Sequence, residues 1–96
     1  MNNHTNQITI AGTITEDPKF FDLKTKKGKL AAFSVREDSA KNRKQTFRVV
    51  TDRTALHTII ENLKKDSSIE VIGNAYPKKY NDYLYIEVTA ENIITN

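Results

Sequence analysis

Residues 45–76 have the sequence QTFRVVTDRTALHTIIENLKKDSSIEVIGNAY, and the hydrophobic period changes twice within it. Residues 45–51 alternate apolar and polar side chains as a β-strand does, and residues 68–76 alternate again. The stretch therefore predicts a strand, a helix over about residues 54–65 and a second strand. The helix is indicated by apolar residues at the i, i+3, i+4, i+7 spacing of one helix face: Leu56, Ile59, Ile60 and Leu63.

Two more strands are predicted on the N-terminal side. Residues 7–15 alternate, and Gly12 inside this strand suggests a bulge or a coiling bend. An extended segment over residues 19–25 leads to a turn at Lys26-Lys27-Gly28, because glycine tolerates positive φ. Residues 29–37 form the next strand.

The C-terminal side supplies the last strand. Asp52 or Thr54 is expected to cap the helix, and Pro77 is expected to end the hydrogen bonding of the following strand. Asn81-Asp82 predicts a tight turn before a strand over residues 83–89. The order of three strands, one helix and two strands is that of the OB-fold, a five-stranded Greek-key barrel. An SH3-like barrel is the main alternative, and it has no place for this helix.

Length and composition limit the possible classes of protein. The 96 residues predict one OB-fold domain over residues 7–96, after a flexible N-terminus over residues 1–6. There is no cysteine, so disulfides and thiolate metal sites are excluded. No signal peptide or membrane-spanning run is present, which predicts a cytoplasmic protein without a membrane partner.

The positive charge is concentrated in one part of the chain. Ten of the 15 basic residues lie between Lys19 and Arg48, a range that contains three acidic residues. A folded β surface that concentrates lysine and arginine is typical of a protein that binds a phosphate backbone. A well-solvated surface is the alternative explanation.

Several stretches resemble bacterial and phage single-stranded-DNA-binding proteins of the SSB type: residues 8–18, 29–35, 47–50, 63–73 and 85–91. The resemblance implies an OB-fold that binds single-stranded DNA. Three departures are clear. The chain has no tryptophan, and Thr46 stands where the family usually has one. The sequence ends soon after the last strand, without the family's acidic tail, and its loops are short. These departures suggest a reduced relative, from a phage or mobile element.

Binding single strands requires cations for the phosphates and flat rings on which bases stack. Phe47 alternates with Val49 and is therefore more typical of the core, whereas Tyr83 and Tyr85 share the outer face, where they could instead stabilise a sheet or subunit contact. Phe20 and Phe21 are adjacent, so one should point outward. The predicted nucleic-acid-binding residues are Lys24, Lys26, Lys27, Arg36, Lys41, Arg43, Lys44, Phe47, Arg48, Lys78, Lys79, Tyr80, Tyr83 and Tyr85.

Catalysis is not expected. The two histidines, His4 and His57, are isolated, and the carboxylates are scattered, so neither a metal nor a cofactor is predicted. The leading hypothesis is a protein that coats or protects single-stranded DNA during replication or recombination, without strong sequence preference. The alternatives are a primosomal-type adaptor that uses the barrel to contact replication proteins, and an RNA-binding OB domain.

The protein is also expected to be a symmetric homo-oligomer, because joining several short grooves along one strand raises affinity. The first strand is the predicted edge, and its Thr9, Thr13 and Thr15 face is suited to pairing with a symmetry mate. The family resemblance places a tetramer ahead of a dimer.

Overall fold

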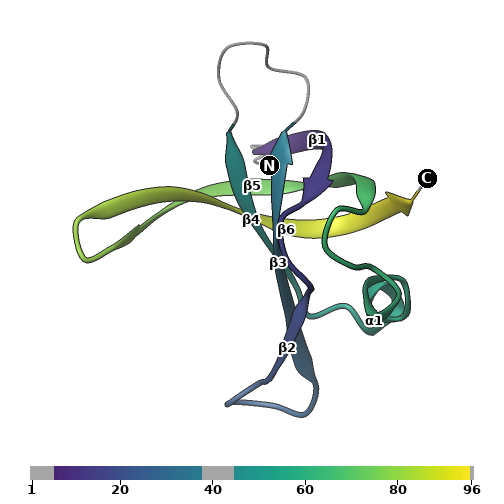
Figure 1. Cartoon of the computed structure of the whole chain (residues 1–96). Helices are drawn as coiled ribbons and strands as arrows, with labels where there is room; N and C mark the ends of the chain where they lie inside the picture. The colour runs from purple at the N-terminus through teal and green to yellow at the C-terminus, as the bar shows by residue number, and fades with distance from the viewer. Residues whose placement is uncertain (1–5, 38–44, 96) are drawn as a thin grey trace, which may run out of the picture.

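The computed structural model describes residues 6–37 and 45–95, which form a β-barrel with one helix and two projecting hairpins (Figure 1). The predicted Lys41, Arg43 and Lys44 lie outside the described residues. The elements are β1 (Gln7–Ile14), β2 (Lys19–Asp22), β3 (Lys29–Glu37), β4 (Thr46–Thr51), α1 (Thr54–Glu61), β5 (Ser68–Tyr80) and β6 (Tyr83–Thr95).

Five strands close into a ring in the order β1, β5, β6, β4, β3, because β1 pairs with both β5 and β3. Only the β4–β6 pairing is parallel among the described strands. The short β2 adds a two-stranded extension to β3 outside the ring. The helix lies between β4 and β5, the third and fourth strands of the ring, so the predicted OB-fold is confirmed.

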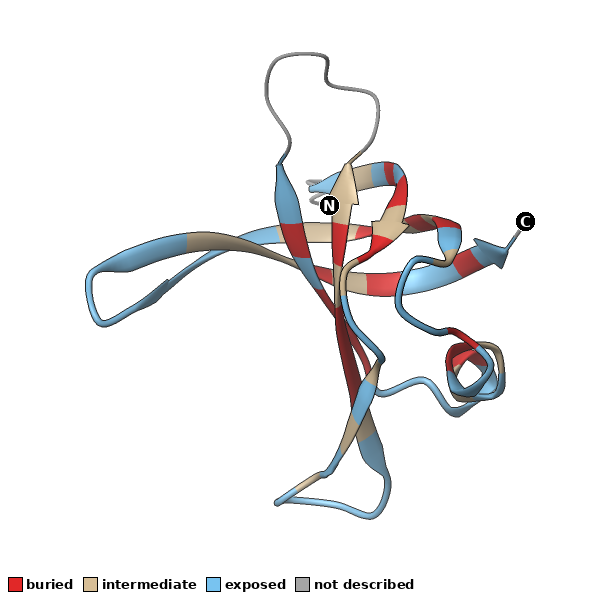
Figure 2. Cartoon of the chain, in the orientation of Figure 1, coloured by how far each residue is buried: buried red, intermediate tan, exposed pale blue. Residues whose placement is uncertain are grey.

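The core lies where the inward-facing side chains of the barrel strands meet one face of α1 (Figure 2). Alternation along each strand sends every second residue inward, and these positions hold β-branched residues that pack well on a pleated surface. Leu56 and Ile60 of α1, together with Leu63 just beyond it, cover one side of this core. The largest fully buried side chains of the strands are Ile10, Ile14, Val35, Val49, Thr51, Ile69, Val71 and Val88.

Two glycines mark the points where backbones come closest. A side chain at Gly12 would overlap the carbonyl oxygen of Arg36 on β3, and one at Gly73 would overlap that of Thr89 on β6. The β-bulge lies between Ile72 and Gly73, whereas the β1 pairings at Gly12 are in regular register. Gly12 is therefore a residue at which β1 pairs with β3 and β5 at once, and its pairings show no bulge.

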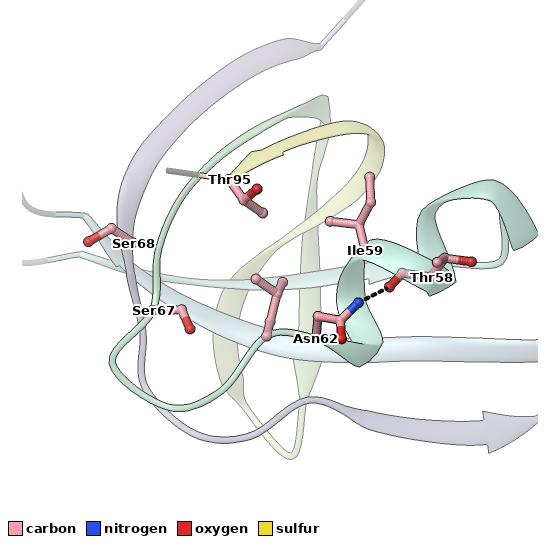
Figure 3. Close-up of a pocket in the computed structure, with 7 residues that line it drawn as sticks. Thr58, Ile59, Asn62, Ser67, Ser68 and Thr95 are labelled. Carbon is pink, nitrogen blue, oxygen red and sulfur yellow. Dashed lines mark hydrogen bonds between the residues drawn. The ribbon is translucent and has the colours of Figure 1, made fainter.

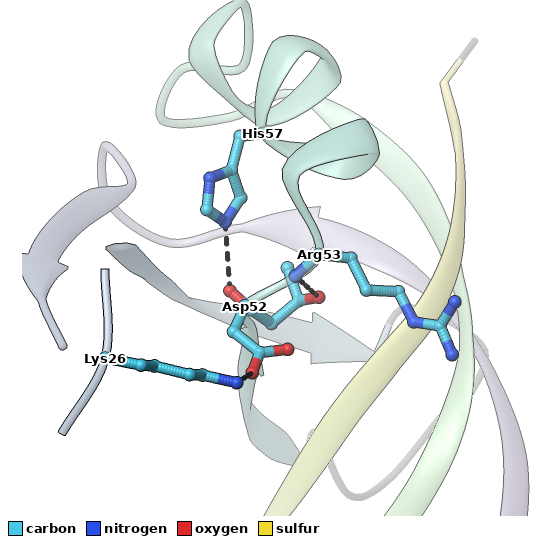
Figure 4. Close-up of polar contacts among 5 residues, drawn as sticks. Lys26, Asp52, Arg53 and His57 are labelled. Atoms are coloured by element: carbon cyan, nitrogen blue, oxygen red, sulfur yellow. Dashed lines mark hydrogen bonds and ion pairs between the residues drawn. The ribbon is translucent and has the colours of Figure 1, made fainter. Parts of the chain in front are cut away.

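The helix differs from its predicted form at both ends. It ends at Glu61, before Lys65, and the N-cap residue is Arg53, without a capping side chain. Asp52 instead forms an ion pair with Lys26, with 3.2 Å between Oδ2 and Nζ (Figure 4). The helix start is tied to β4 by Thr51, whose side chain accepts a hydrogen bond from the Arg53 N–H. Asp52 is thus engaged in a tertiary contact, and a local hydrogen bond to Thr51 holds the helix start in place of the predicted cap.

The hairpin of β5 and β6 is longer than predicted and projects from the barrel as an arm (Figure 1). The prediction that Pro77 ends the strand's pairing is wrong, because Pro77 lies opposite Ile86 and β5 continues to Tyr80. Beyond Asn74, β5 has no second strand beside it in the described structure, so the missing N–H of proline is tolerated.

The turn of the arm is a tight two-residue loop, as predicted. Asn81 and Asp82 both have positive φ, 48° and 68°. This is the backbone of a type I′ turn, whose twist matches that of the flanking strands. The turn fixes the register of the arm, with Tyr80 opposite Tyr83.

Candidate nucleic-acid interface

The outer face of the arm carries four tyrosines and one lysine. Residues opposite one another in an antiparallel pair point to the same face. The register places Lys78 opposite Tyr85 and Tyr80 opposite Tyr83. One step toward the barrel, Tyr76 lies opposite Glu87. On β5 this face therefore alternates rings and a charge, whereas on β6 two rings precede Glu87.

Three of these tyrosines line a concave site that we call the tyrosine pocket. The rings of Tyr83 and Tyr85 are stacked, with centroids 6.5 Å apart and planes at 21°. Tyr80 and Tyr83 are 70% and 69% exposed, so their faces are open to a ligand. The pocket encloses about 590 Å³ and is lined by Ser34, Thr46, Arg48, Tyr80, Tyr83, Tyr85 and Glu87.

Four strands that are neighbours in the sheet, β5, β6, β4 and β3, build this pocket. The β3–β4 register sets Ser34 opposite Arg48, and the parallel β4–β6 pairing sets Arg48 opposite Glu87. Open aromatic rings beside a guanidinium suit a ligand with flat faces and negative charge, since bases stack on rings and arginine pairs with phosphate. The arrangement has the chemistry of a nucleotide-binding surface.

Several lysines near the predicted surface are held by acidic residues. Lys79 lies on the opposite side of the arm from Lys78, and its Nζ is 3.7 Å from Asp82. Lys26 pairs with Asp52 at the turn between β2 and β3. Lys24 and Lys27 at the same turn are exposed and form no ion pair within the described part of the chain.

The structure divides the predicted site residues into groups. Arg48, Tyr80, Tyr83 and Tyr85 meet in the tyrosine pocket, and Lys78 adjoins it. Arg36 lies next to the pocket, on the outer face of β3 opposite Thr46, and is partly buried. Lys79 lies on the other side of the arm. Lys24, Lys26 and Lys27 belong to the β2–β3 hairpin, which projects in another direction than the arm (Figure 1).

Phe47 requires a correction. Its side chain is 4% exposed and packs in the core, because it shares the inward parity of Val49 on β4. The core interpretation is therefore confirmed, and the ring is not available to a nucleic acid. Phe21 is the outward member of its pair, whereas Phe20 contacts the His57 ring edge at 5.4 Å between centroids.

Four residues of this surface are not among those predicted from the sequence: Ser34, Thr46, Tyr76 and Glu87. Pro77 predicts the end of the strand just after Tyr76, although the alternation of Tyr76, Lys78 and Tyr80 indicates that one face continues past the proline. The other three reach the tyrosine pocket because of the register in which their strands pair, and this register cannot be read from the sequence.

A second cleft of about 660 Å³ lies at the C-terminal end of α1 (Figure 3). No ionisable side chain lines it, and the Asn62 amide donates a hydrogen bond to the Thr58 carbonyl inside it. Such a lining cannot neutralise phosphates. The tyrosine pocket, which contains Arg48, is therefore the candidate nucleic-acid site.

Other chemistry finds little support in the described residues. They contain no cluster of three or more histidine, cysteine or acidic residues that could hold a metal ion. His57 Nε2 lies 3.1 Å from the Thr51 carbonyl oxygen, so this nitrogen is engaged in anchoring α1 (Figure 4). Within the same residues, no helix is both long and apolar enough to span a membrane.

No protein-family model matches the sequence, and no curated protein sequence matches it significantly. Solved structures do match. The SSB domain of a Synechococcus protein superposes with a TM-score of 0.78 at 15% identity, over 98% of this chain and 99% of that one.

Two further structures match as well. The small single-stranded DNA-binding protein of Streptomyces coelicolor gives a TM-score of 0.79 at 16% identity, covering 98% of this chain and 96% of its own. The second single-stranded DNA-binding protein of Mycobacterium smegmatis gives 0.77 at 22% identity, covering 97% and 90%. The chain therefore has the fold of solved SSB domains along almost its whole length.

Proposed function

We propose that this protein binds single-stranded DNA with little sequence preference, and coats or protects it during replication or recombination. The tyrosine pocket carries the proposal: two open tyrosine rings, a stacked third ring and Arg48 meet on the outer face of an OB barrel. Stacking is tolerant of sequence because every base has a flat face.

The geometry favours single strands over duplex. The rings of Tyr80 and Tyr83 can stack only on bases whose faces are exposed, and a duplex hides those faces. The cations on the same surface would track the backbone. Strand coating follows from binding that depends on stacking and charge rather than on base edges.

We expect tight binding to oligo-dT and weak binding to duplex DNA of equal length in fluorescence anisotropy. On single strands, each neutralised phosphate contributes about −0.7 to the slope of log affinity against log salt. A slope of about −3 or steeper is expected if the basic residues beside the pocket and on the β2–β3 hairpin engage. Equal affinities for the two forms, or a flat salt response, would contradict the proposal. A matched RNA oligonucleotide tests the RNA-binding alternative.

The proposal includes a symmetric homo-oligomer, with a tetramer ahead of a dimer. β1 pairs with β5 over residues 7–13 but with β3 only over residues 12–14. The predicted edge is thus confined to residues 7–11, where β1 has no second strand beside it in the described structure; Thr13 and Thr15 instead lie against β3. An open strand edge can pair with its symmetry mate.

Light scattering over a dilution series is expected to give a tetramer mass at micromolar concentration, falling to dimer on dilution. Shortening the edge strand by deleting residues 2–7 should shift the equilibrium toward smaller species. A monomer across the whole series would contradict the assembly proposal and would favour the adaptor function below.

A protein-interaction adaptor is the second candidate, and the inner side of the arm favours it. Leu84 is 72% exposed there, and with Pro77 and Ile86 it borders a hollow of about 570 Å³ whose other lining residues are Gln45, Thr46, Tyr83 and Tyr85. Exposed apolar surface of this kind suits a protein partner. If the chain is an adaptor for replication proteins, Leu84→Ala will impair partner capture and leave DNA affinity unchanged.

A further inference from the structure

Glu87 occupies an unexpected place for an acidic residue. It lines the tyrosine pocket, two residues along β6 from Tyr85 and on the same face. Its side chain is 19% exposed, less than either cation beside it. A partly covered carboxylate in a phosphate-binding surface opposes the proposed ligand, so it calls for an explanation.

The carboxylate lies between two cations that come from different strands. Its Oε2 is 3.5 Å from Nε of Arg48 on β4, and its Oε1 is 4.0 Å from Nζ of Lys78 on β5. Both contacts are longer than the roughly 2.7–2.9 Å of a charge-assisted hydrogen bond. Glu87 therefore balances the charge of both cations without binding either tightly.

We infer that Glu87 is a built-in competitor for phosphate, which sets the strength and the salt dependence of strand binding. In the free protein its carboxylate takes the position that a phosphate oxygen would take beside Arg48 and Lys78. A bound strand must share these cations with it, so the three residues act as a single positive charge toward DNA. This inference rests on the proposed function.

Removing the Glu87 charge should change DNA binding without changing stability, unlike the removal of a purely structural ion pair. Surface ion pairs contribute little to stability, and Arg48 and Lys78 are 44% and 47% exposed. Removing the carboxylate should therefore leave the fold intact. It should also present one more net positive charge to the strand. By competing with phosphate, Glu87 would lower the affinity for DNA without abolishing it. Such moderate affinity would suit a protein that must release DNA as well as bind it.

The test is Glu87→Gln, which keeps the shape of the side chain and removes its charge. At about 50 mM salt we expect binding to oligo-dT to tighten about two- to five-fold, the range of one exposed ion pair. The salt slope should become more negative by about 0.7, the contribution of one extra phosphate. The melting temperature should be unchanged.

Glu61→Gln is the matched control, because it makes the same change of net charge on α1, outside the tyrosine pocket. It should leave affinity and slope at the wild-type values. If Glu87→Gln remains folded but binds oligo-dT no more tightly than wild type, the inference is wrong. Equal effects of both variants would also overturn it, since net charge alone would explain them. Failure of wild type to bind oligo-dT would instead refute the proposed function itself.

Discussion

Replacing Tyr83 by alanine is expected to weaken binding of single-stranded DNA by about 1–3 kcal/mol, the contribution of one base stacked on one ring. Tyr80→Ala should have an effect of the same size. Tyr80 and Tyr83 are 70% and 69% exposed and contribute little to the core, so the melting temperature should hardly change. The salt slope should also stay the same, since no phosphate contact is lost.

Leu84→Ala is the matched control for Tyr83→Ala. Leu84 is adjacent in sequence and equally exposed, but alternation places it on the other face of the arm. Its replacement should leave DNA affinity unchanged, and Tyr83→Phe should retain most of it because the ring remains. Equal losses for Leu84→Ala and Tyr83→Ala would contradict stacking. A fall in thermal stability without a loss of affinity would place the tyrosines in a sheet or subunit contact.

Alanine at Gly73 is expected to destabilise the fold by about 1–3 kcal/mol or more, the range for overpacking in a filled site. The added Cβ would overlap the carbonyl oxygen of Thr89 and would lie 3.0 Å from the Cα of Ala90. Both are backbone atoms of β6, which cannot swing aside as a side chain can. For a domain of this size, a loss of 3 kcal/mol lowers the melting temperature by roughly 12–24 °C.

Gly12→Ala should behave similarly, since its Cβ would overlap the carbonyl oxygen of Arg36 and approach Val35 Cγ1 to 3.0 Å. Ala11→Gly supplies the baseline, because Ala11 is the exposed neighbour on the same strand and the exchange costs only about 0.5–1 kcal/mol. Thermal or urea unfolding measures all three. If Gly12→Ala and Gly73→Ala are as stable as wild type, the strands can move apart at these two positions, contrary to this prediction.

The order of elements could be predicted because it depends on local patterns. Alternation in residues 45–51 and the helical spacing of Leu56, Ile60 and Leu63 are properties of short segments, and each segment forms what its pattern indicates. The element boundaries were less predictable. Asp52 could cap the helix in isolation, but in the folded chain it pairs with Lys26 from a distant turn.

Pro77 illustrates the same limit for strands. Proline removes one backbone donor, and whether that matters depends on which strands lie on either side. No third strand flanks β5 at Pro77 in the described structure, so the pairing with β6 continues to the turn. Neighbouring strands are a tertiary property, and the extra length of the arm could not be read from the residues around Pro77.

The sequence by itself determined that Tyr83 and Tyr85 share one face, and that Phe47 shares the face of Val49. Successive side chains of a strand point to opposite sides, so these relations hold in any fold that keeps the strands. Only the tertiary structure decided which residues of different strands become neighbours on each face. The β4–β6 pairing brings Arg48 opposite Glu87, and the long arm brings Lys78 and Tyr80 beside them. The barrel closure that sets these neighbours is a sum of many long-range pairings, and no single stretch of the sequence contains it.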